Sequence, residues 1–207
     1  MISLQPGLCV RRRYKGLFVN MPESPAVATD MAGLDRGLSL SLSDRLAVAS
    51  AVLFVVILAV AAFWDSSIRV LHLFEAVPYL LAAALITRRR RFGYILGVAC
   101  GAFWLWTAGF LTTFIKNGFE RLASLMLTGH VDRWDILIAV PAAVGTGGLV
   151  LFSAVSYLRS ADKSLMDAVR FLGTSALVAG FFVLIFRLFA PQYLGMFGSM
   201  LPAFLKP

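Results

Sequence analysis

The chain has 207 residues, 59% of them hydrophobic and only 14% charged, and a formal net charge of +8. A water-soluble domain needs more surface charge than this, and the mean hydropathy of +0.83 also argues against a soluble globular protein. The basic residues stand mostly beside the ends of apolar runs. Membrane topology therefore explains the positive charge, and no nucleic-acid partner is expected.

The first 43 residues are polar by comparison and contain three prolines, which predicts a poorly ordered cytoplasmic tail. No apolar stretch follows Arg11–Arg13 closely enough to form a signal peptide. Met21 and Met31 are plausible start residues beside Met1, so the sequence leaves the true start open.

Residues 44–190 carry apolar runs of about 20 residues, the length that crosses a bilayer as a helix. We therefore predict an all-α, polytopic membrane bundle with five transmembrane helices, at residues 46–64, 66–87, 92–115, 136–158 and 168–189. Asp65 stands where it can N-cap the second helix, and Pro78 should kink that helix. Residues 191–207 are too short and too interrupted for a sixth crossing, and we expect an interfacial tail.

The loop at 116–135 has the pattern of a short amphipathic helix lying on the membrane surface. Asn117 followed by Glu120 resembles a capping-box start, and Gly129 can end the helix. The apolar residues between them share one helical face, as an interfacial helix requires.

The Arg88–Arg91 run sets the orientation, because clustered basic residues stay on the cytoplasmic side of a membrane. Counting lysines and arginines along the predicted loops puts most of them on the side of this run. The N-terminus is therefore expected in the cytoplasm and the C-terminus outside. The excess of arginine over lysine is typical of bacterial genes rich in G and C, so we expect the inner (cell) membrane.

Small residues recur at four-residue spacing, which lets helix backbones approach closely. Two sets are expected to make such packing faces: Gly93, Gly97 and Gly101 in the third span, and Ala139, Ala143 and Gly147 in the fourth. In the fourth span, Pro141 and the glycines at 145–148 allow a second interpretation, a hinge or unwound site of the kind found in transporters.

Glu75 and Arg187 are charged residues within apolar segments, at compatible predicted depths. An unpaired charge there is costly, so we predict an intramembrane ion pair between them. The alternative is that Arg187 extends to the outer headgroups while Glu75 bonds to His72 or Arg69 on its own helix.

The sequence offers little for catalysis or cofactors. His72 and His130 both fall towards the outer side and could together ligate a haem or a metal, although each also suits a plain structural role. No catalytic motif is present, so an enzyme is disfavoured, and bound lipids are the only expected small molecules.

Two functions follow from these features. The first is a non-catalytic accessory or assembly subunit that packs against other membrane proteins or against itself, as the small-residue faces suggest. The alternative is a small oligomeric transporter or channel with a polar path near Glu75, His72 and the fourth helix, because ionisable groups inside membranes are functional candidates.

Overall fold

A computed structural model describes residues 40–160, 164–192 and 195, and every regular element in these ranges is a helix. Five helical segments are long and apolar enough to cross a membrane. The predicted all-helical bundle with five candidate spans is thus confirmed, while insertion into a membrane stays a prediction. The predicted N-terminal and C-terminal tails lie almost wholly outside the described residues. The candidate spans are α2 (Leu42–Trp64), α3 (Arg69–Thr87), α4 (Arg91–Trp106) with the π-helix η1 (Thr107–Leu111), α6 (Trp134–Leu137) with α7 (Ala139–Arg159), and α8 (Leu165–Phe189).

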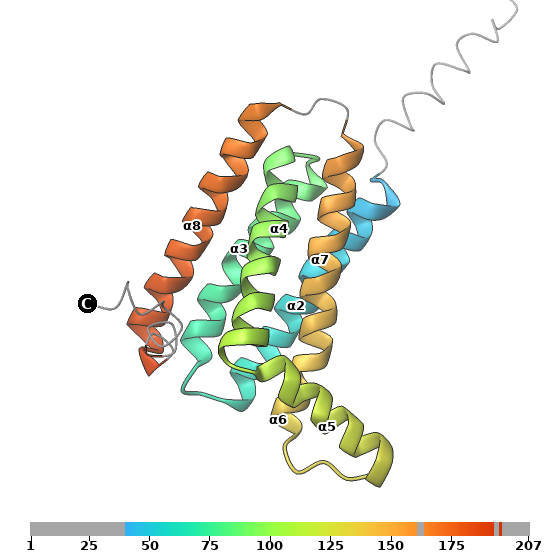
Figure 1. The fold of residues 1–207 in the computed structure, drawn as a ribbon, viewed down its shortest axis with the longest axis vertical. Coiled ribbons are helices and arrows are strands. Elements are labelled where there is room, and N and C mark those ends of the chain that lie inside the picture. Colours follow the sequence, from blue (N-terminus) through green and yellow to red (C-terminus); the bar gives the residue numbers. More distant parts are fainter. Residues whose placement is uncertain (1–39, 161–163, 193–194, 196–207) are drawn as a thin grey trace, which may run out of the picture. The chain divides into compact units, whose positions relative to one another are not determined.

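Four of these helices form a ring in which each contacts its two neighbours (Figure 1). Helix α2 packs on α3 and α7, and α4 packs on the same two helices, while α8 lies outside the ring against α4 and α3. Successive spans are antiparallel. The turn between α3 and α4, at residues 88–90, therefore lies at one end of the bundle, which we call the arginine end. The loop between α2 and α3 lies at the opposite end, called here the cavity end.

Helix α2 begins four residues earlier than predicted, because Ser41 and Asp44 form a capping box. Asp44 is also tied to α4, since the Tyr94 hydroxyl donates a 3.0 Å hydrogen bond to its carboxylate. The predicted cap at Asp65 is wrong. Its carboxylate instead accepts from the backbone N–H and hydroxyl of Ser67, and α3 begins at Arg69 rather than at residue 66.

The glycines of α4 lie against neighbouring helices. A Cβ atom built at Gly97 would come within 2.7 Å of the Ser153 Oγ on α7. One at Gly101 would lie 2.6 Å from Val150 and 3.1 Å from the carbonyl oxygen of Thr146, and one at Gly93 would meet α3. The missing side chains are what let α4 approach both helices closely.

In α7 the predicted face is covered only at Ala139, which is fully buried against Gly118 of α5, and the close contact with α2 falls on a different face. A Cβ at Gly147 would have nothing within 4 Å among the described residues, whereas one at Gly145 would lie 3.3 Å from the backbone of Ser50 and Phe54 on α2. The helix is also continuous through its glycines. The break is at Ile138, and Pro141 sits in the first turn of α7, where a missing N–H costs no hydrogen bond.

Helix α5 (Phe114–Thr128) occupies the predicted loop and packs on the start of the fourth span through Gly118. Its predicted start is wrong, because Asn117 lies within the helix. The chain turns at Thr113, which has a left-handed φ of 55°, and α5 begins directly after it. Gly129 ends α5 with a φ of 69°, as predicted.

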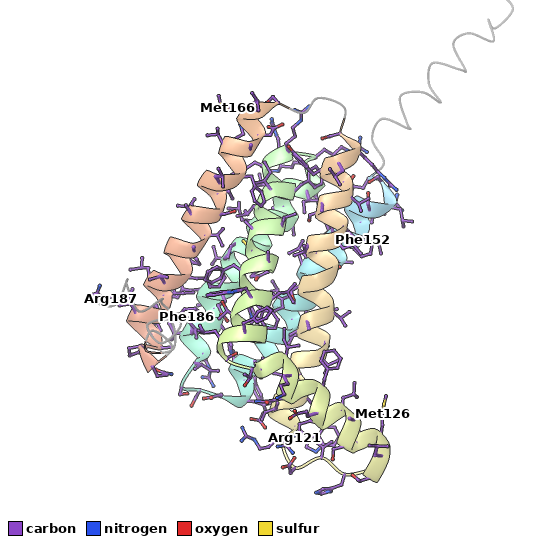
Figure 2. The ribbon with its side chains drawn as sticks, viewed as in Figure 1. Arg121, Met126, Phe152, Met166, Phe186 and Arg187 are labelled. Atoms are coloured by element: carbon purple, nitrogen blue, oxygen red, sulfur yellow. The ribbon has the colours of Figure 1, made fainter. Side chains whose placement is uncertain are left out.

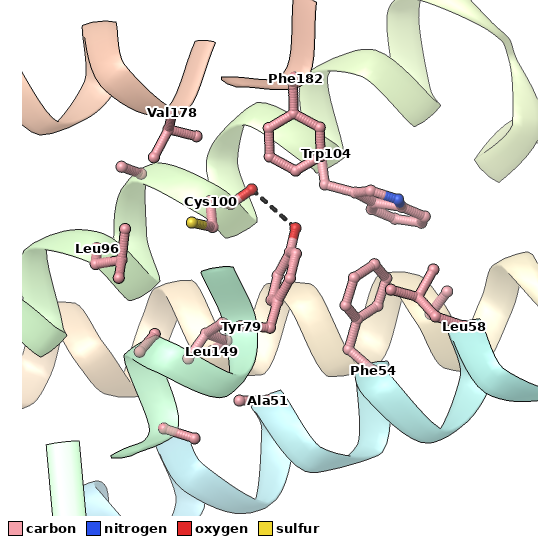
Figure 3. Close-up of a cluster of buried hydrophobic side chains, with 14 of the residues drawn as sticks. Ala51, Phe54, Leu58, Tyr79, Leu96, Cys100, Trp104, Leu149, Val178 and Phe182 are labelled. Atoms are coloured by element: carbon pink, nitrogen blue, oxygen red, sulfur yellow. Dashed lines mark hydrogen bonds between the residues drawn. The ribbon is translucent and has the colours of Figure 1, made fainter. Parts of the chain in front are cut away.

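An aromatic cluster fills the middle of the ring (Figure 3). The rings of Phe54 and Tyr79 lie 4.4 Å apart, and the Phe54 ring meets Trp104 edge-on at 5.0 Å. The buried Tyr79 hydroxyl donates to the Cys100 carbonyl at 3.0 Å, so this polar group is satisfied. The cluster separates the tightly packed arginine end from a more open cavity end.

Candidate functional site: a cavity around Glu75

A cavity of about 370 Å³ lies at the cavity end and is lined by all five candidate spans and by α5. On α2 its lining runs from Phe54 to Trp64, which is about 15 Å at 1.5 Å per residue. It therefore reaches into the bundle from one end and stops at the aromatic cluster. The polar lining residues are Asp65, His72, Glu75, Thr107, Thr112, Asn117 and Asp135.

Glu75 is the most deeply buried ionisable group of this lining, with 5% of its surface exposed. It lies one turn after His72 on α3, and the His72 Nδ1 donates to its Oε2 at 2.7 Å. The His72 side chain is 15% exposed. A carboxylate held in an apolar bundle is costly unless it is hydrogen-bonded, and the i,i+3 spacing on one helix supplies the partner locally.

The mouth of the cavity carries two further carboxylates. Asp65 ends α2, and the hydroxyl and N–H of Ser67 hold its pKa below the ordinary value, so it stays ionised at neutral pH. Asp135 is paired with the exposed Arg133 through two hydrogen bonds. No lysine or arginine is among the described residues that line the cavity.

A π-helix forms one wall. At η1 the Thr112 N–H bonds to the Thr107 carbonyl oxygen at 3.0 Å, five residues back. The Thr107 and Thr112 hydroxyls are turned onto backbone carbonyls of α4 and η1, which satisfies them inside the wall. Single π-helical turns are uncommon and occur frequently at functional sites, because they widen a helix locally.

Aromatic rings make up much of the remaining wall. Phe54 and Trp104 form the floor, and Phe182 of α8 stacks on Phe103 at 4.9 Å. Trp64 stands at the mouth. The site is thus an aromatic-walled cavity with one buried carboxylate, which is the usual composition of a small-molecule site.

The predicted ion pair between Glu75 and Arg187 is not formed. Glu75 bonds to His72, and Arg69 donates instead to the Ala62 carbonyl oxygen at the end of α2. Arg187 is exposed, and its side chain points away from the bundle (Figure 2). It lies in the last turn of α8, where a cation suits the negative end of the helix dipole.

The two histidines do not share a site. His130 is exposed in the loop after α5 and is not among the residues that line the cavity. Within the described part of the chain, no group of three or more His, Cys, Asp or Glu side chains is placed to hold a metal ion.

Sequence reasoning found Glu75 and His72 but missed Thr107, Thr112 and Asn117. The one available signal was the pair of threonines at 112 and 113, which closes the apolar run of the third span. Comparisons of the chain with protein-family models, with curated proteins and with solved structures give no match.

Proposed function

We propose that the chain is an integral membrane protein that binds a small solute in the cavity, as a transporter or channel component does. The observation that carries this proposal is Glu75, a buried carboxylate in the lining of a cavity whose other walls are largely aromatic and aliphatic. Placing a charge near the centre of a membrane helix costs roughly 2.5–3.5 kcal/mol. A helix that serves only to pack against a partner gains nothing from that cost.

The closed floor supports solute binding over an open pore. Phe54, Tyr79 and Trp104 fill the ring beneath the cavity, and small residues pack the arginine end tightly. A solute bound at Glu75 is thus accessible from one side. Passage to the other side requires the aromatic cluster to move, as in alternating access.

The predicted topology places the mouth of the cavity outside the cell. The arginine end carries the basic run and is expected in the cytoplasm. The cavity end is then external, in the inner (cell) membrane of a bacterium. Such a site would take its solute from outside, or release it there.

A screen of thermal stability tests this proposal on the purified full-length protein. Small cationic, neutral and anionic solutes are added singly, and a bound solute raises the melting temperature. We expect at least one solute to stabilise the wild type and to lose its effect in Glu75→Gln. Asp132→Asn is the matched control, because Asp132 is an exposed carboxylate outside the cavity that pairs with Arg121. A screen in which no solute shifts the melting temperature would overturn the proposal.

A second candidate, the accessory subunit, is favoured by the outer face of α8. Gly173 and Gly180 stand two helical turns apart there, and a Cβ at either would meet no described atom within 4 Å. In this role the glycines receive a helix of a second membrane protein or a second copy. Gly173→Leu and Gly180→Leu would then abolish a stoichiometric complex without lowering the stability of the isolated chain, whereas an unchanged complex would remove this candidate.

A further inference from the structure

We propose that the solute taken by the cavity is an organic cation with an apolar body, such as a substituted amine or a quaternary ammonium compound. This proposal rests on the proposed function, because it names the class of solute for the same site. It follows from the charge of the lining, the atoms of Glu75 that remain available, and the nature of the walls.

The charge of the lining favours a cation. Glu75 supplies a carboxylate in the depth of the cavity and Asp65 supplies one at the mouth. The third carboxylate of the lining belongs to Asp135, and its negative charge is largely offset by the paired Arg133. With no lysine or arginine among the described lining residues, an anionic solute would meet like charges and no fixed cationic side chain to offset them.

One carboxylate oxygen of Glu75, Oε1, is available to accept a hydrogen bond from a bound solute. His72 donates to Oε2, and no group in the described ranges donates to Oε1. An ionised carboxylate accepts several hydrogen bonds, so a bound ammonium group can share Glu75 with His72 without breaking their contact. His72 then fixes the orientation of the carboxylate.

The walls suit the apolar body and the charge together. Aromatic rings attract cations through their π faces, and tryptophan does so most strongly. Trp64 lies at the mouth and Trp104 at the floor, so a cation meets an indole at both ends of the cavity. A volume of about 370 Å³ is within the range of small-molecule pockets.

Two probes of the same shape isolate the charge. Benzyltrimethylammonium is a cation, and neopentylbenzene is its neutral isostere, with carbon in place of nitrogen. Their dissociation constants are measured on the full-length protein in detergent by tryptophan fluorescence. Ala61→Phe is the control for partition of the probes into the micelle. Ala61 lines the cavity and is half-buried, so the larger side chain fills part of the cavity, and any signal that remains in this variant comes from the micelle.

We expect the cation to bind wild-type protein on the order of tenfold more tightly than its isostere, as a charge-assisted contact in a desolvated site implies. Glu75→Gln should remove this preference, and Asp132→Asn should keep it. Equal binding of the two probes would overturn the cation proposal and leave the proposed function standing. If Glu75→Gln does not fold, the two probes on wild-type protein still decide the matter. If neither probe bound and no solute of the thermal screen bound, both the cation proposal and the proposed function would be overturned.

Discussion

The contact between Gly97 and Ser153 offers the sharpest test of how the ring is packed. A Cβ at Gly97 would lie 2.7 Å from the Ser153 Oγ and 3.2 Å from a Leu149 methyl group. Ser153 is fully buried, and its hydroxyl has no hydrogen-bond partner in the described part of the chain. The hydroxyl is thus both an obstacle to a larger residue at 97 and an unsatisfied polar group.

Gly97→Ala should lower the stability of the protein. Overpacking a tight contact typically costs about 1–3 kcal/mol. Alanine also favours a helix over glycine by about 0.5–1 kcal/mol, which partly hides that cost. Gly147→Ala is the matched control, because Gly147 is in a helix but a Cβ there meets no described atom within 4 Å. We expect Gly97→Ala to be less stable than this control by about 1–3 kcal/mol.

Ser153→Ala should reverse that loss. Alone it should be neutral or stabilising by about 1 kcal/mol, because it removes a buried hydroxyl that has no hydrogen-bond partner among the described residues. Combined with Gly97→Ala it removes the atom that the new methyl group would strike. The two changes should therefore couple by about 0.5–3 kcal/mol in a double-mutant cycle, measured by reversible unfolding in mixed micelles. Strictly additive effects would refute the close approach of α4 to α7.

Three further expectations concern the helix ends, the topology and the buried pair. Gly129→Ala should cost about 1 kcal/mol in a thermal melt, because the left-handed φ of 69° at the end of α5 strains any L side chain; an unchanged melt would contradict that backbone conformation. Reporter fusions at Lys206 and within the 88–91 turn should report opposite sides of the membrane, and the same side for both would contradict five crossings. His72→Leu should destabilise the protein by about 1–3 kcal/mol by leaving Glu75 without its hydrogen-bond partner, and Glu75→Leu added to it should recover much of that loss, so a double variant no better than His72→Leu would argue against the pair.

The five spans were predictable because the bilayer sets a length that apolar composition alone reveals. The packing face of α4 was predictable for a related reason. Gly93, Gly97 and Gly101 form the one set of three glycines at four-residue spacing in this span, so the sequence favours that face. In α7 small residues occupy several faces at once. There the position of α2 decides which glycines are covered: its backbone at Ser50 and Phe54 covers Gly145, and the Ser50 hydroxyl covers Gly148.

The predicted pair of Glu75 and Arg187 failed for a geometric reason. Counting residues gives the depth of a side chain along a helix, because each residue rises by about 1.5 Å. It does not give the direction in which that side chain points around the axis when the neighbouring helices are unknown. Helix α8 packs on the ring mainly through α4 and α3, and Arg187 lies on the face turned away from the bundle.

Only some of the residues that line the cavity could be predicted from the sequence. Glu75 and His72 stood out because charged and polar groups are rare in apolar runs. The π-helical turn at Thr107–Leu111 has no such signal, since a single extra residue in a turn leaves the apolar pattern almost unchanged. The start of α5 was misplaced for a similar reason, because a left-handed residue at Thr113 is not expected for a β-branched side chain.

Labelling of single cysteines in intact cells tests most directly whether a water-accessible cavity opens on the side opposite the arginines. Cysteine is placed at Ala61, which lines the cavity, or at Val60, the adjacent residue, which lies on the exposed outer surface of α2. The two native cysteines, Cys9 and Cys100, are first replaced. A maleimide that cannot cross membranes reacts with the thiolate, which forms in water and not in lipid. The proposed arrangement predicts rapid labelling of Ala61→Cys from outside and little labelling of Val60→Cys. Equal labelling of both, or protection of Ala61→Cys in intact cells with labelling only after lysis, would contradict it.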